Sequence, residues 1–331
     1  MLTTTPPEGA QLDAALAPIR RAVVAQTRTR HRVRRWGFAT AGAALALSCG
    51  LVALNLVGVS PLAGLDGSRG GATAEAAELL DDAATLSIGA SDPVVGPGQY
   101  LRIETKSNSI GSFGLPDGTM FSAAVPETST VYEPADPEAD WVLVRKSGEP
   151  TAFYPAAEAE RWAAEYAAIG TPYPEGTIRA QDGAFYGPEP WADPDVESMP
   201  TDDPRKTLAW FDDRYTGGSS NKAEDTFVRA TDLLRQGTVR ADQRAAIYGM
   251  LTLVPGVTIT DATATLDGRA GVALGRDEPA RDGERQEIVI DPETGAFIGE
   301  RFLAGTEGYE VPAGEVTGST SVTTTVVDTA P

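Results

Sequence analysis

The feature that most constrains this chain is an uncharged apolar run that directly follows a cluster of arginines. No charged residue occurs between Arg35 and Asp66. The hydrocarbon core of a bilayer is about 30 Å thick, and a helix that rises about 1.5 Å per residue needs about 20 apolar residues to cross it. The run from Gly37 to Val59 is long enough. The sequence therefore predicts a transmembrane helix over 37–59.

The arginines before the run predict its orientation, because basic residues that flank a span stay on the cytoplasmic side. We expect residues 1–36 to form a basic cytoplasmic arm and everything after Ser60 to lie outside. The predicted location is the cell membrane, with one pass, a cytoplasmic N-terminus and an extracytoplasmic C-terminal domain. The residues expected to orient the chain in the membrane are Arg28, Arg30, Arg32, Arg34, Arg35 and Trp36.

Two other interpretations of the apolar run are weaker. A cleaved signal peptide has a shorter apolar region with a small-residue site close behind it, and the nearest such site, Ala72-Thr73-Ala74, lies well past Val59. The segment before Cys49 resembles a lipoprotein signal, but the sequence stays apolar after it. A retained anchor is favoured.

Gly42, Ala46 and Gly50 stand four apart, a spacing that lets two spans approach and form a homodimer.

Beyond the span, composition and periodicity divide the chain into a Gly-rich spacer, 60–73, an exported domain, 74–305, and a Thr/Val-rich tail, 306–331. An apolar stripe from Ala76 to Ala84 predicts a helix there, and helical periodicity with capping residues predicts further helices over about 155–169, 204–215, 222–236 and 241–253. Alternation and β-rich composition predict strands over about 99–107, 120–125, 128–132, 141–146, 177–179, 257–264, 270–276, 286–290 and 297–303.

The order of these elements favours an α+β fold. Strands come first, then helices, then strands again, without regular alternation, which is typical of an antiparallel sheet packed on helices. We expect Asp291 to Gly295 to form a hairpin turn, and the tail from Ser319 to Val327 either to add an edge strand or to be disordered. A curled sheet like that of lipoprotein-carrier half-barrels is the expected form.

The residue inventory excludes most catalytic chemistry from the exported part. The single histidine is His31 and the single cysteine is Cys49, so no Ser-His-Asp triad, Cys-His dyad, histidine zinc site or disulfide is available there. A net charge of −20 argues against a nucleic-acid ligand. We therefore expect no enzyme activity and no cofactor.

Three weaker chemical signals remain. Ser219-Ser220-Asn221-Lys222 fits the Ser-x-x-Lys pattern of a serine–lysine dyad, although linker and capping roles explain it as well. Paired carboxylates for glycoside cleavage are not singled out by any motif. Two acidic segments allow an irregular calcium site, against the simpler interpretation of solvated loops: Asp193, Asp195 and Glu197, and Asp136, Glu138 and Asp140.

Aromatic residues concentrate between Trp141 and Trp191. Such side chains on a half-open sheet could line a cavity for an apolar ligand, or they could fill a core and anchor the long loop over 171–204. The core interpretation is favoured. The aromatic residues concerned are Trp141, Phe153, Tyr154, Trp162, Tyr166, Tyr173, Phe185, Tyr186 and Trp191.

A series of short segments resembles an actinobacterial family of single-span membrane proteins of unknown function with an exported α+β domain. The resemblance implies a non-enzymatic exported domain and, loosely, a link to extracytoplasmic sigma-factor systems; it carries over no site residues. The matching segments are Ala76 to Leu80, Pro97 to Leu101, Ala245 to Tyr248, Leu253 to Val257, Gly271 to Leu274 and Ile290 to Gly295, with Gly299 and Glu300.

Three functions remain open at this point. The leading one is a single-pass envelope sensor or regulator, whose partners are the lipid bilayer and a cytoplasmic regulatory protein that binds the N-terminal arm. The second is a structural module of the envelope that binds lipid or cell-wall polymer. The third, far weaker, is a carboxylate-based hydrolase.

Overall fold

A computed structural model describes residues 70–331 except 91, 171–174 and 307–310. The predicted cytoplasmic arm, transmembrane helix, possible span-mediated homodimer and nearly all of the Gly-rich spacer lie outside the described residues. Among the helices that are described, none combines the length and the apolar character that crossing a bilayer requires.

The described chain contains five α-helices and ten strands, joined by four short 3-10 turns. The helices are α2 (Ala74–Gly89), α3 (Ala159–Ile169), α4 (Pro204–Asp212), α5 (Lys222–Gln236) and α6 (Ala241–Leu251). The strands are β1 (Tyr100–Gly114), β2 (Met120–Pro134), β3 (Trp141–Ser147), β4 (Ala152–Tyr154), β5 (Gly176–Ala180), β6 (Thr258–Leu266), β7 (Arg269–Glu278), β8 (Glu284–Ile290), β9 (Phe297–Leu303) and β10 (Val316–Val327).

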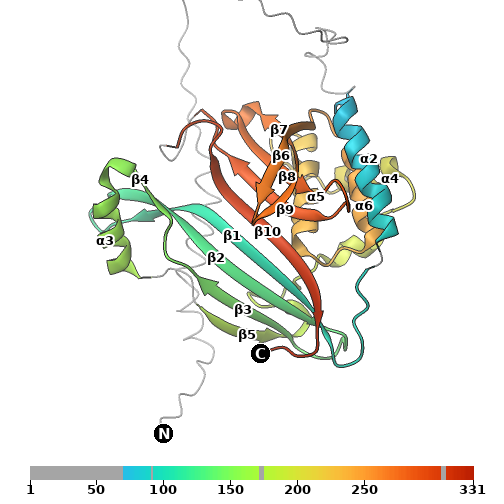
Figure 1. The fold of residues 1–331 in the computed structure, drawn as a ribbon, viewed down its shortest axis with the longest axis horizontal. Helices are drawn as coiled ribbons and strands as arrows, with labels where there is room; N and C mark the ends of the chain where they lie inside the picture. Colours follow the sequence, from blue (N-terminus) through green and yellow to red (C-terminus); the bar gives the residue numbers. More distant parts are fainter. Residues whose placement is uncertain (1–69, 91, 171–174, 307–310) are drawn as a thin grey trace, which may run out of the picture. The chain divides into compact units, whose positions relative to one another are not determined.

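All the strands belong to one antiparallel sheet, which confirms the predicted α+β class (Figure 1). Their order is β5-β3-β2-β1-β10-β9-β8-β7-β6, and β4 pairs with β2 beside β3. The path has two ends, β5 and β6, which do not pair with each other. The sheet is therefore open rather than a closed barrel.

The position of β10 corrects the expected edge strand. Val316–Val327 pairs with β1 on one side and with β9 on the other, so it lies in the middle of the sheet. Its Thr/Val composition suits a strand between two neighbours, where β-branched side chains pack against both. The tail is thus part of the same sheet and joins the strands that precede the helices to those that follow them.

Strand β2 also differs from expectation, because it runs unbroken through Pro126 where two shorter strands were predicted. Proline has no N–H to donate, so it suits a position where none is needed. The β2 ladder with β3 begins at Glu127, and its ladder with β4 ends at Ala124. Pro126 lies in the gap between those two partners, where its missing N–H breaks no ladder hydrogen bond.

The sheet is strongly curled at its β6 end. Strands lie about 4.8 Å apart, so five steps would place β6 about 24 Å from β1 in a flat sheet. Instead the β6–β7 turn reaches across: Asp267 accepts hydrogen bonds from Lys106 of β1 (3.1 Å) and from Ser321 of β10 (3.1 Å). Arg269 of β7 donates to the carbonyl of Val322 at 2.9 Å. Apolar side chains fill the inside of the curl: Ala264, Leu266, Ala273, Val289 and Ile298.

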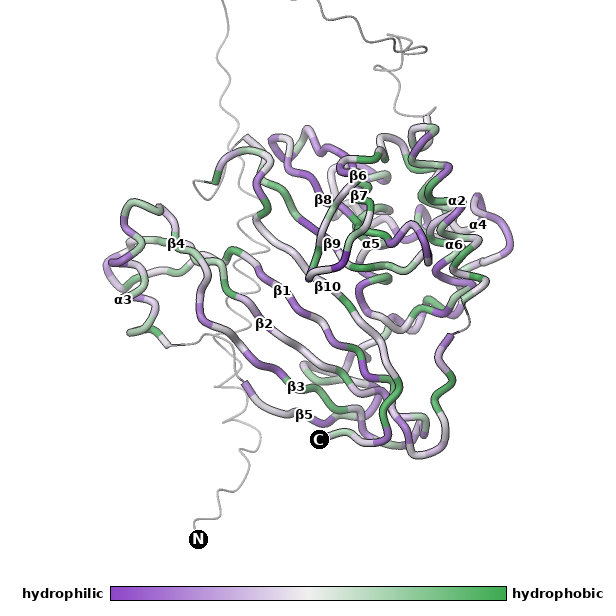
Figure 2. The backbone as a smooth tube through the Cα atoms, in the orientation of Figure 1, coloured by the Kyte–Doolittle hydropathy of each residue, from purple (hydrophilic) through white to green (hydrophobic). Residues whose placement is uncertain are grey.

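Helices α2, α4, α5 and α6 pack on the opposite face of the β6–β9 half and enclose the largest core. Apolar segments gather where α2 and α6 meet, as the colouring of Figure 2 shows. Tyr248, Phe211 and Phe227 are its largest fully buried side chains. Asn221 accepts the hydrogen bond of the Glu224 N–H at the start of α5, and Gly237 ends that helix in a left-handed conformation, as the capping pattern predicted.

Candidate functional site

The membrane-orienting residues predicted from sequence, Arg28, Arg30, Arg32, Arg34, Arg35 and Trp36, lie outside the described residues. The clusters of polar and aromatic side chains described below all belong to residues 70–331.

Six of the aromatic residues between Trp141 and Trp191 lie in or against two separate cores, whereas Tyr186 is exposed and Tyr173 lies outside the described residues. Trp141 and Phe185 are buried with Ile103, Leu143 and Val322, which places the long loop over β1, β3 and β10. Trp162 and Tyr166 of α3 pack on Phe121 of β2 at the far end of the β1–β2 hairpin. The Trp162 and Phe121 rings stack with centroids 5.2 Å apart. The structure supports the core interpretation.

The Ser-x-x-Lys segment serves as linker and cap. Asn221 caps α5, the Ser220 N–H donates to Glu224 at 2.7 Å, and the Ser219 hydroxyl faces Asp225. Lys222 points away toward Asp212, with its Nζ 3.7 Å from the carboxylate. Serine and lysine are therefore not brought together as a dyad.

Side chains of the two acidic segments that allowed an irregular calcium site make other contacts. Asp193 caps a 3-10 turn, Asp195 lies 3.7 Å from Arg214, and Glu197 pairs with Arg240 at 2.6 Å. Asp136 accepts the N–H of Glu138 in a turn. No group of acidic side chains within the described ranges is arranged to hold a metal ion.

Two of the hollows on the surface of the described residues are large enough to hold a small molecule. One, of about 230 Å³, is floored by Trp210, Phe211 and Leu233 and rimmed by Asp193, Arg229, Asp232 and Gln236. The other, of about 280 Å³, lies beside the turns at Asp282–Gly283 and Ala313–Gly314. Both are open to solvent and neither gathers groups that could act together in a reaction.

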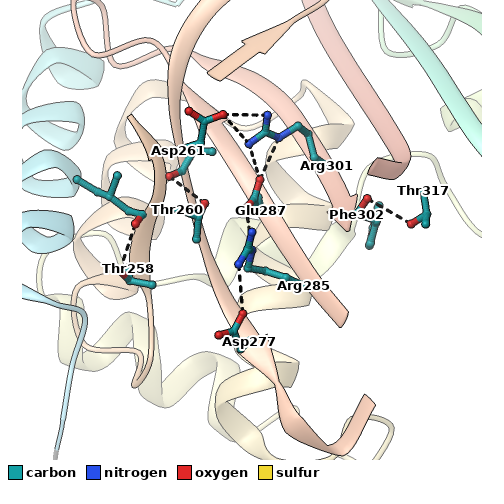
Figure 3. Close-up of polar contacts among 11 residues, drawn as sticks. Thr258, Thr260, Asp261, Asp277, Arg285, Glu287, Arg301, Phe302 and Thr317 are labelled. Atoms are coloured by element: carbon teal, nitrogen blue, oxygen red, sulfur yellow. Dashed lines mark hydrogen bonds and ion pairs between the residues drawn. The ribbon is translucent and has the colours of Figure 1, made fainter. Parts of the chain in front are cut away.

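Charged side chains form a ladder on the curled face of β7, β8 and β9 (Figure 3). Glu287 is fully buried and lies between two arginines: Arg285 Nε donates to it at 2.8 Å and Arg301 Nη2 at 2.6 Å. Arg301 also contacts Asp261 of β6 at 3.3 Å, and Arg285 contacts Asp277 at 3.4 Å. The ladder joins four neighbouring strands through their side chains.

A second group of charges is buried between α5 and the sheet. Glu300 of β9 is fully buried and accepts from Arg235 of α5 at 2.5 Å and from Gln286 of β8 at 2.8 Å. These bonds satisfy both carboxylate oxygens, which burial would otherwise penalise strongly. The contact fixes the C-terminal half of α5 to the middle of the sheet.

The N-terminal end of α5 covers a less complete cluster. Glu224 pairs with Arg281, while Arg276 Nε lies 3.1 Å from Glu278 Oε1 on the same strand. Arg276 Nε and Nη1 and Glu278 Oε2 are buried without a hydrogen-bond partner among the described residues. Burial raises the pKa of Glu278 to about 7, against the attraction of Arg276 and with the help of the nearby Glu224 carboxylate. Burial likewise lowers the pKa of Arg276.

Glu278→Gln is expected to flatten the pH dependence of stability. The folded-state pKa of Glu278 lies above the ordinary glutamate value of 4.5, so the folded protein binds this proton more tightly than the unfolded chain. Its contribution to the free energy of unfolding is therefore present at low pH and is lost as pH rises through 7, by about 2 kcal/mol between pH 5 and 8. Urea unfolding of both proteins at several pH values measures this difference. If the difference in free energy of unfolding between the wild type and Glu278→Gln is the same at pH 5 and at pH 8, the raised pKa of Glu278 is contradicted.

No sequence signal pointed to these buried carboxylates, because Glu287 and Glu300 occur in strands where alternation also allows their side chains to face solvent. These charged clusters have a structural role, because each fully buried carboxylate is neutralised by at least one arginine. None of the described clusters offers a free nucleophile or two free carboxylates facing one another.

Comparisons with known proteins add little. No protein-family model matches the chain, and a search of curated proteins gives no match. Among solved structures, a chain of the MucA/MucB complex of Pseudomonas aeruginosa is similar to this one, with 10% sequence identity and a TM-score of 0.24. The alignment covers 78% of this chain and 59% of that chain. A crystal structure of MucB in complex with MucA(peri) aligns with 77% of this chain and 57% of its own at 8% identity and a TM-score of 0.22. This chain thus spans less than two thirds of either neighbour, and similarity of this size establishes neither a shared fold nor a shared function.

Proposed function

We propose that this chain is a single-pass, non-enzymatic regulator of the cell envelope, whose exported domain binds a protein partner and whose basic arm reports to a cytoplasmic protein. The observation that carries the binding role is the protruding end of the β1–β2 hairpin. Strand β1 pairs with β10 only as far as Ser109, but with β2 as far as Gly114. The hairpin end therefore continues past the neighbouring strand.

This hairpin end is a folded surface of its own. Phe113 and Phe121 belong to the core that α3 closes with Trp162 and Tyr166, and β4 pairs with Ser122 to Ala124. Figure 1 shows α3 and β4 at the end of the hairpin, away from the helical layer. A core that holds a projecting element rigid is suited to presenting it to another macromolecule. The buried ladders of arginine and glutamate, in contrast, stabilise the sheet behind it.

The anchoring and reporting parts of the proposal rest on the sequence, on the run over 37–59 and on the arginines before it. A curled sheet comparable to a lipoprotein-carrier half-barrel remains part of the proposal. Its concave side here is filled by Leu266, Val289 and Ile298, which favours binding on the outer surface over binding within the curl.

Deleting residues 2–30 is expected to leave the protein in the membrane fraction and to abolish its effect on gene expression. The span and Arg32, Arg34 and Arg35 remain in this variant and suffice for orientation. The measurement is the transcript profile of cells that carry the deletion in place of the full chain. A matched control scrambles residues 2–27 and keeps their composition, so that charge alone cannot account for the result.

Transcript profiles that are the same for the full chain, the deletion and a strain lacking the protein would refute the regulatory role. A wild-type profile for the scrambled control would show that arm charge, rather than a specific contact, carries the report.

A further inference from the structure

One edge of strand β1 is unpaired along the end of the hairpin. The β10 ladder stops at Ser109 paired with Gly318, and the described chain adds no other strand beside Ile110 to Gly114. On its other edge the same segment stays paired with β2 up to Gly114 and Met120. The segment is held in extended conformation by one neighbour and leaves the second side open.

The register decides which backbone groups face the open side. The Ala135 N–H donates to the Gln99 carbonyl at 3.0 Å, and the Leu115 N–H donates to the Thr119 carbonyl at 2.8 Å. Odd-numbered residues of β1 therefore form the hydrogen-bonded pairs with β2, because such pairs alternate in an antiparallel ladder. The N–H and C=O groups of Ser112 and Gly114 point the other way, and both residues are exposed.

The open edge lacks the features that normally prevent strand addition. Natural edge strands carry lysine, proline, a bulge or an inward charge. From Ser107 to Leu115 this strand has no charged residue and no proline, although the chain as a whole has a net charge of −20. An unprotected edge of this kind is a liability unless it is used.

Exposed apolar side chains flank the edge at both of its ends. Met120, the cross-strand partner of Gly114, is 59% exposed at the hairpin tip. At the other end Val316 and Phe302 are 46% and 38% exposed where β10 begins. Phe302 lies beside Gly318, and a Cβ built on that glycine would be 3.4 Å from the phenylalanine ring.

We propose that the open edge of β1 at Ser112 and Gly114 binds a short extended segment of a partner protein, which adds to the sheet as an antiparallel strand in line with β10. Backbone hydrogen bonds supply the affinity in this mode, and side-chain pockets supply the choice of sequence. The segment that fits is uncharged, because the edge is neutral within an acidic domain, and carries apolar side chains that reach Met120 and Phe302. This inference names the site for the partner in the proposed function and rests on it.

The length of the edge favours a peptide segment over a second copy of this chain. The open stretch ends at the Leu115 turn on one side and at β10 on the other. If the β1 of a second copy paired here, its own β10 and its own hairpin turn would meet the Leu115 turn and the β10 strand that bound the open stretch. A flexible segment of a few residues avoids that conflict.

The test uses the full chain in detergent and, as the probe, a short acetylated, amidated peptide of alternating threonine and valine carrying a fluorophore. Fluorescence anisotropy is expected to show saturable binding that Ser112→Pro weakens at least tenfold, because proline removes the outward N–H and keeps the β2 ladder. Ser112→Thr keeps the backbone donor and is expected to bind like the wild type. Hydrogen exchange at the Ser112 and Gly114 amides should slow when the peptide is present.

A second variant guards against misfolding. Ser112→Lys adds a charge at the edge and leaves all backbone groups, and it is expected to weaken binding as well. Retained exchange protection at the Phe113 amide, which faces β2, shows that each variant is folded. Equal binding by wild type, Ser112→Pro and Ser112→Lys would overturn the proposal, as would a dimer of the full chain that Ser112→Pro dissociates.

The transcript profile separates this proposal from the proposed function. If deletion of residues 2–30 abolishes the response and Ser112→Pro leaves it intact, the edge proposal fails and the regulatory function stands. If peptide binding depends on Ser112 but neither variant changes any transcript, the edge proposal stands and the regulatory function fails.

Discussion

Replacing Glu287 with alanine is expected to lower the free energy of unfolding by about 3–5 kcal/mol. Glu287 is fully buried and is the only carboxylate that both Arg285 and Arg301 contact in the described ladder. Its removal leaves two guanidinium groups close together, with side chains 28% and 13% exposed, and only the longer contacts to the more exposed Asp277 and Asp261 then compensate their desolvation. Urea unfolding of a fragment covering residues 70–331, followed by tryptophan fluorescence, gives the value.

Asp277→Ala is the matched control for Glu287→Ala. Asp277 ends the same ladder, but its side chain is 71% exposed and its contact with Arg285 is long, at 3.4 Å. An exposed ion pair of this kind contributes about 0–1 kcal/mol. A cost for Glu287→Ala as small as that of the control would mean that water reaches the two arginines and replaces the carboxylate.

The second large effect is expected for Gly299→Ala, which should cost about 3 kcal/mol or more. A Cβ at this position would lie 1.9 Å from the backbone oxygen of Thr320 and 2.7 Å from Leu266 Cδ2. The oxygen belongs to the paired strand β10, so no side-chain rotation can relieve the contact. Relief requires β9 to move away from β10 or the β6 end of the sheet to uncurl.

Thermal unfolding monitored by circular dichroism measures this loss in the same fragment. Gly218→Ala is a suitable control, because a Cβ there meets nothing within 4 Å, and the expected change is within about 0.5 kcal/mol. Wild-type stability of Gly299→Ala would show that β9 and β10 are further apart than described. The curled arrangement of Leu266 over Gly299 would then be wrong.

Local signals in the sequence predicted individual elements well where the chain itself supplies the cause. The turn from Asp291 to Gly295 forms as expected: the Asp291 N–H donates to the Ala296 carbonyl at 2.9 Å, and Gly295 has a φ of +69°. Asp203 caps α4 ahead of Pro204, and Gly170 ends α3. In each case one or two adjacent residues fix the conformation.

Long-range pairing was not predictable in the same way. Strand β1 continues to Gly114 through serine, asparagine and glycine, which have low β propensity, because β2 pairs with it over its whole length. The central place of β10 and the burial of Glu287 depend on strands far apart in sequence. The open edge at Ser112 could not be located without knowing where β10 stops.

The placement of β10 between β1 and β9 has a consequence for biosynthesis. The ribosome makes β1 roughly 200 residues before it reaches Val316, which takes about 10–40 s at typical elongation rates. During that interval β1 lacks its partner strand β10, and the newly made helices can pack only on an incomplete sheet. A nascent chain of this design therefore needs shielding against strand exchange with other polypeptides until its last β segment emerges, and products truncated before Val316 should be removed by proteolysis.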